Sequence, residues 1–72
     1  MVASLVVQSR ADQVLRQSPI PALRRLSAEE NDRTVVLSGS VSSYYLKQLA
    51  QETVMPILGS RELENRVLVV RS

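Results

Sequence analysis

The chain has 72 residues, a length that allows one small domain with a marginal core. It contains no cysteine and no histidine, which excludes a disulfide framework, a thiolate metal site and the commonest general base. Nine basic and seven acidic groups leave a net charge of only +2, so no nucleic-acid partner is predicted. The only aromatic residues are Tyr44 and Tyr45, and the core must therefore be aliphatic.

The first predicted element is a helix over residues 4–17. Apolar residues recur there at the spacing of one helical face; they are Val7, Ala11, Val14 and Leu15. Ser9 and Asp12 have the spacing of a capping pair, which offers Ser9 as an alternative start. Residues 1–10 are therefore predicted to be a frayed N-terminal segment, and residues 11–72 the folded domain.

Two strands joined by a tight turn are predicted next. Pro19 and Pro21 keep the linker after the first helix extended and stiff. Residues 22–30 and 34–41 alternate between apolar and polar side chains, as strands with one buried face do. The polar residues 31–33 between them favour a turn, so the two strands form a hairpin.

A second helix and a last strand complete the chain. Ser42 or Ser43 is expected to cap this helix, and Pro56 and Gly59 to end it. Its apolar stripe consists of Leu46, Leu49, Ala50, Thr53, Val54 and Ile57. Residues 62–70 alternate as a strand. The order α-β-β-α-β predicts an α+β two-layer sandwich, in which a three-stranded mixed sheet carries both helices on one face.

Two segments of the chain carry the pattern of a known family. Residues 35–41, Val-Val-Leu-Ser-Gly-Ser-Val, resemble the hairpin strand of the BON domain, which is named for bacterial osmotically inducible and nodulation proteins. Residues 59–69 resemble its second signature, in which a glycine precedes a hydrophobic residue, an asparagine and two alternating hydrophobic residues. The matching structural positions are Gly39, Gly59 and Asn65. The resemblance covers nearly the whole chain.

The resemblance implies an αββαβ fold and a non-catalytic module that attaches proteins to membrane phospholipid. The chain departs from the family pattern at Glu30, where a hydrophobic residue is usual, and at Arg33, where glycine is usual. Strand one is therefore expected to fray at its end. Family members are often periplasmic or in the cell envelope, whereas this chain as given begins without a signal-peptide pattern and is predicted to be cytoplasmic.

No enzyme, metal or cofactor is predicted. Glu29, Glu30 and Asp32 cluster at the hairpin turn, but their spacing matches no calcium loop, and we interpret them as a solvated turn. The serine residues lack a histidine base, and no serine–lysine motif replaces it. A non-catalytic binding module is the remaining interpretation.

Basic residues and an exposed ring are the candidate contacts for anionic membrane lipid. They are Arg24, Arg25, Tyr44, Lys47 and Arg61. Basic side chains bind anionic headgroups, and an amphipathic ring suits a membrane–water interface. The alternative is a solvated surface of mixed charge, because acidic residues are interleaved with the basic ones. Tyr45 is expected to be half-buried against the sheet.

The sheet face away from the helices is the candidate oligomer face. It is predicted to expose Val36, Leu68 and Val70, with Leu23 as a further candidate. A contiguous apolar patch marks an interface, so self-assembly or a protein partner is the alternative function. Equally, the N-terminal residues 2–6 could cover the same face.

Overall fold

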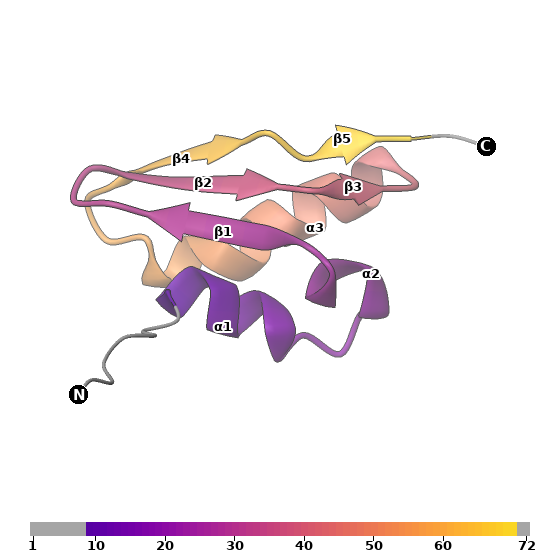
Figure 1. Ribbon diagram of the computed structural model, residues 1–72, viewed down its shortest axis with the longest axis horizontal. Coiled ribbons are helices and arrows are strands. Elements are labelled where there is room, and N and C mark those ends of the chain that lie inside the picture. The colour runs from indigo at the N-terminus through magenta and orange to yellow at the C-terminus, as the bar shows by residue number, and fades with distance from the viewer. Residues whose placement is uncertain (1–8, 71–72) are drawn as a thin grey trace, which may run out of the picture.

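The structure is a computed structural model that describes residues 9–70. A twisted sheet forms one layer and the helices cover one of its faces (Figure 1). The elements in chain order are α1 (Arg10–Arg16), α2 (Pro21–Arg24), β1 (Ser27–Glu30), β2 (Thr34–Ser38), β3 (Ser40–Val41), α3 (Tyr44–Val54), the 3-10 helix η2 (Met55–Ile57), β4 (Glu62–Asn65) and β5 (Leu68–Val69). The predicted α+β architecture with a three-stranded mixed sheet is confirmed.

The sheet has the strand order β1-β2-β4, with β1 antiparallel and β4 parallel to β2. A parallel pair, β3 and β5, continues the same ladder beyond Gly39. The strand predicted at 34–41 is therefore divided, because Gly39 adopts a φ of +124° and bends the chain between β2 and β3. The strand predicted at 62–70 is also divided, into β4 and β5, with Arg66 and Val67 between them.

The first helix begins at the alternative start. Ser9 is the N-cap of α1, and its Oγ accepts the amide of Asp12 at 2.9 Å. Residues 4–8 of the predicted helix lie outside the described residues, as do residues 2–6, which were expected as a cover for the sheet.

The strand predicted at 22–30 is wrong in its first half. Pro21–Arg24 forms the short helix α2, and β1 begins only at Ser27. Pro21 occupies the first position of α2, where its missing amide costs nothing and its fixed φ suits a helix. Leu23, a candidate for the open sheet face, is instead completely buried by this turn of helix.

The second predicted helix is α3. The Oγ of Ser43 accepts the amide of Leu46 at 3.2 Å, so Ser43 is its cap. Pro56 lies in the 3-10 turn η2 that ends the helix, and Gly59 then turns the chain with a φ of +66°. Both stop signals are confirmed.

The core lies between the helices and the sheet. It is aliphatic, as expected, and consists of Ala11, Leu15, Leu23, Leu26, Val35, Leu37, Val41, Ala50, Val54, Leu58 and Val67. Asn65 connects the two layers: its Nδ2 donates to the carbonyl of Lys47 at 3.1 Å, and its Oδ1 accepts the amide of Val67 at 3.1 Å. This residue thereby fixes α3 against the junction of β4 and β5.

Candidate functional site

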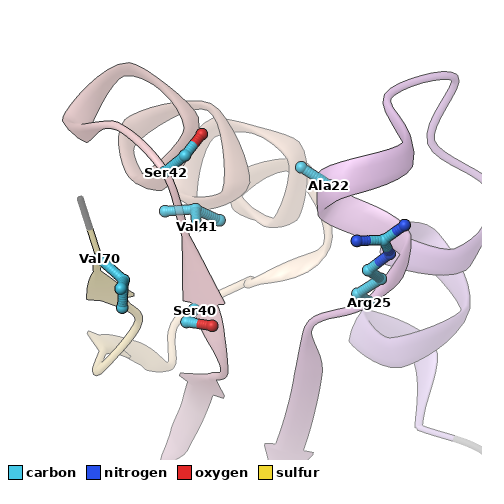
Figure 2. A pocket seen from close by; sticks show the side chains of 6 residues that line it. All are labelled: Ala22, Arg25, Ser40, Val41, Ser42 and Val70. Carbon is cyan, nitrogen blue, oxygen red and sulfur yellow. The ribbon is translucent and has the colours of Figure 1, made fainter. Parts of the chain in front are cut away.

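A surface hollow of about 270 Å³ lies where α2 faces β3. It is lined by Ala22, Arg25, Ser40, Val41, Ser42 and Val70. Figure 2 shows Ala22 and Arg25 on one wall, opposite the residues of β3, with Val70 beyond β3. The hollow combines one guanidinium, two hydroxyl groups and short apolar side chains, which is a set suited to an anionic oxygen group attached to an apolar body.

The hollow belongs to one end of the molecule. Figure 1 shows α2, β3, β5 and the start of α3 gathered there, opposite the turn between β1 and β2. We call this part the β3–β5 end. The acidic residues of the chain are Asp12, Glu29, Glu30, Asp32, Glu52, Glu62 and Glu64. None of them belongs to α2, β3, β5 or the first half of α3. Acidic residues are thus absent from the elements of this end, although acidic and basic residues are mixed along the sequence and elsewhere in the fold.

Two exposed arginine residues supply positive charge to the β3–β5 end. Arg24 is the last residue of α2 and Arg25 follows it, and neither forms an ion pair within residues 9–70. The amino end of α3 lies at the same end and adds the positive pole of its helix dipole. An anion bound in the hollow would therefore lie near these positive charges. No carboxylate of α2, β3, β5 or the first half of α3 would repel it.

Exposed rings and aliphatic side chains belong to the start of α3 and to the β5 segment at this same end. Tyr44 is 68 % exposed and Tyr45 is 71 % exposed, and Leu68 and Val70 are also exposed. The expectation that Tyr45 is half-buried is wrong. Helical periodicity places Tyr45 on the side of α3 opposite the buried Ala50, so both rings face outward.

Arg61 is separated from the other candidate lipid contacts. Its Nη1 donates to Oε1 of Glu30 at 2.6 Å. Its Nη2 and Nε donate to the carbonyls of Ile57 at 2.9 Å and Leu58 at 3.1 Å. The guanidinium is therefore bound within the protein and supports the fold, which removes Arg61 from the surface that a ligand would contact.

The Glu30 carboxylate that binds Arg61 also belongs to the fold. The amide of Ala11 donates to Oε2 of Glu30 at 2.7 Å, and this bond lowers the pKa of Glu30. Partial burial raises that pKa, and hydrogen bonds from Arg61 and Ser9 lower it further, so the net direction is downward. Glu30 also stays within β1, because its side chain is fixed by these partners, and the strand does not end early there.

Lys47 is less exposed than Arg24 and Arg25. It lies one turn after Tyr44 on α3 and is partly buried, while its carbonyl accepts the side chain of Asn65. The structure thus brings Arg24, Arg25 and Tyr44 to the β3–β5 end, with Lys47 beside them.

The candidate oligomer face is not one continuous apolar patch. Val36 is only partly exposed and lies between Glu29 of β1 and Glu64 of β4 on that face. Leu68 lies opposite Ser40, further along the ladder. Leu68 and Val70 form an apolar end of the face, whereas Val36 is surrounded by acidic groups.

A second hollow, of about 490 Å³, lies at the opposite end of the molecule and is lined by Asp32, Arg33, Thr34, Ser60 and Glu62. The carboxylates of Asp32 and Glu62 would repel an anionic ligand there. Within residues 9–70 no three carboxylate side chains come together as metal ligands, and each buried side-chain nitrogen or oxygen has a hydrogen-bond partner. No helix in this part of the chain is long and apolar enough to cross a membrane.

Sequence reasoning missed the hydroxyl groups and the small residue that line the hollow. Ser40 and Ser42 alternate with the buried Val41, a pattern that could have placed both hydroxyls on the outer side of a strand end. Ala22 could not be found, because the helix that carries it was predicted as a strand.

Comparison with known proteins found no match. No family model matches this chain, no curated protein is similar to it in sequence, and no solved structure matches its fold. Its function has therefore to be inferred from the chemistry of the residues themselves.

Proposed function

We propose that this chain is a non-catalytic module that docks on anionic phospholipid surfaces through its β3–β5 end. The observation that carries the proposal is the distribution of charge: Arg24, Arg25 and two exposed rings belong to an end at which α2, β3, β5 and the first half of α3 contain no acidic residue. The resemblance to the BON domain supports the same function.

The contacts divide according to their chemistry. The guanidinium groups bind headgroup phosphate, and the hydroxyls of Ser40 and Ser42 donate to its remaining oxygen atoms. Tyr44 and Tyr45 lie at the level of the headgroups, where an amphipathic ring is favoured. Each basic residue near an anionic surface contributes about 1 kcal/mol, so we expect weak binding that falls as salt is added.

Co-sedimentation with vesicles tests the proposal. We expect binding to phosphatidylglycerol vesicles at low salt, less binding at high salt, and none to phosphatidylcholine. Arg25→Glu should lower binding strongly. Arg33→Glu is the matched control, because Arg33 is also exposed but lies at the opposite end, and the change in net charge is identical. Equal loss in both variants, or no binding by the original chain, would contradict the proposal.

A second candidate function is self-assembly through the open sheet face. The exposure of Leu68 (65 %) and Val70 (56 %) favours it. Val36→Lys places a charge on this face. The fold should tolerate the new amine, because it would lie between the carboxylates of Glu29 and Glu64. Oligomers that form without lipid and disappear in this variant would support the face; oligomers that persist would exclude it.

A further inference from the structure

The strands β4 and β5 form an open edge of the sheet. The amides that bond inward belong to alternate residues: Glu62 to Arg33, Arg66 to Leu37, Leu68 to Gly39 and Val70 to Val41, at 2.8–2.9 Å between nitrogen and carbonyl oxygen. The backbone groups of the intervening residues therefore point outward. Within the described chain no strand lies beyond this edge, as Figure 1 shows.

The opposite edge of the sheet is closed by α1. The outward amide of Ala28 in β1 donates to Oδ1 of Asp12 at 3.3 Å, and the Oγ of Ser9 lies 3.5 Å from its carbonyl oxygen. The amide of Ala11 is bound to Glu30 of the same strand. Helix α1 thus protects β1 against pairing with another chain, which is how proteins commonly manage an exposed edge.

We propose that the open edge pairs with the same edge of a second copy of this chain, antiparallel and around a two-fold axis at Asn65. In this register Leu63 lies opposite Val67 of the other copy. The backbone of Asn65 faces its own equivalent. The amide of Val67 is already held by Oδ1 of Asn65, so Val67 takes part through its carbonyl. Leu63 and Val69, which are half-buried at the rim, become covered.

Charge selects this register and this partner. Glu64 and Arg66 both have exposed side chains, and within one chain they form an ion pair. With the axis at Asn65, Glu64 of each copy lies opposite Arg66 of the other, so two ion pairs form across the edge. The next registers with outward backbone groups have the axis two residues away. An axis at Leu63 brings Glu62 opposite Glu64 of the other copy twice, and an axis at Val67 uses an amide that Oδ1 of Asn65 already holds. The edge is therefore complementary to itself in one register.

Sedimentation equilibrium over a range of concentrations tests the pairing. We expect the mass to rise from 8.0 kDa toward twice that value. Glu64→Arg and Arg66→Glu each place like charges opposite one another twice, so each should raise the Kd of the dimer about tenfold or more. Combining both changes in one chain restores opposite charges and should restore the dimer. Far-UV circular dichroism checks that each variant is folded.

Mixing the two single variants gives the sharpest result. Each is weakened alone, yet an equimolar mixture should form a heterodimer, because the arginine pair of one chain faces the glutamate pair of the other. Glu62→Arg is the matched control, since Glu62 lies opposite Leu68 and forms no ion pair across the edge. The proposal is overturned by a chain that stays at 8.0 kDa throughout, or by a dimer that both single variants leave unchanged.

Discussion

Of the two glycine residues, Gly39 is the one where an added methyl group should disturb the fold more. A Cβ at Gly39 would lie 2.7 Å from Cδ2 of Leu26 and 3.4 Å from its Cα. Cδ2 is the end of the Leu26 side chain, which is buried, so relieving the clash requires this side chain to shift against its core neighbours. The φ of +124° adds backbone strain, because side chains rarely adopt it. The closely approaching group is thus Leu26, which lies between α2 and β1.

The expected cost of Gly39→Ala follows from these two terms. Backbone strain contributes about 1–3 kcal/mol and overpacking a similar amount, so we expect a loss of about 2–6 kcal/mol in the free energy of unfolding. A chain of this length has about 4–11 kcal/mol in total. Gly59→Ala is the matched control. Its φ is +66° but no atom lies within 4 Å of the added Cβ, so about 1–2 kcal/mol is expected.

Urea unfolding followed by circular dichroism measures both variants. Leu26→Ala removes the atom in closest contact, so the double variant with Gly39→Ala should lose less than the sum of the two single losses, by about 1–2 kcal/mol. If Gly39→Ala is no more destabilising than Gly59→Ala, or if the double variant is strictly additive, the close approach of Leu26 is not what requires glycine.

Two further changes test the contacts that hold α3. Asn65→Ala removes the bonds to the Lys47 carbonyl and the Val67 amide and should cost about 1–3 kcal/mol in urea unfolding; a smaller loss would mean that α3 is held by packing alone. Ser43→Ala removes the helix cap and should cost about 0.5–2 kcal/mol, whereas the neighbouring Ser42→Ala, which removes no capping bond, should change thermal stability little.

Much of the fold follows from local signals in the sequence. Alternating residues placed β2 and β4, the choice between Ser42 and Ser43 placed the start of α3, and Pro56 followed by Gly59 marked its end. The turn at residues 31–33 followed from Asn31, whose Oδ1 accepts the amides of Arg33 and Thr34, both at 2.8 Å. Each of these signals acts within a few residues, which is why the sequence alone contains them.

The features that were missed depend on contacts between distant segments. Pro21 favours a helix start as well as an extended linker, and only the burial of Leu23 decides for α2. Arg61 reaches Glu30 across 31 residues, so no local pattern distinguishes it from a surface arginine. The hollow beside Arg25 is formed by separate segments. The candidate site is therefore predictable as a set of basic residues, but its location and members require the tertiary structure.

The Glu30 carboxylate, bound by the Ala11 amide and by Arg61, makes the stability of this protein dependent on pH. The amide of Ala11, followed by Arg61 and Ser9, lowers the pKa of Glu30 from its ordinary value of 4.5, against the opposing effect of burial. The folded state therefore binds this proton less readily than the unfolded state. The stabilisation is complete above the ordinary pKa and is lost as the pH falls through the lowered one.

Replacing the carboxylate should remove this part of the acid dependence. We expect Glu30→Gln to cost about 1–3 kcal/mol at neutral pH, because the Ala11 amide and Arg61 lose a charged acceptor, and to cost progressively less below pH 4.5. Glu29→Gln changes the charge equally at an exposed position and is the control. Unfolding curves at several pH values measure both. A constant difference between Glu30→Gln and the original chain at every pH would show that packing, and not the carboxylate charge, accounts for the contribution of Glu30.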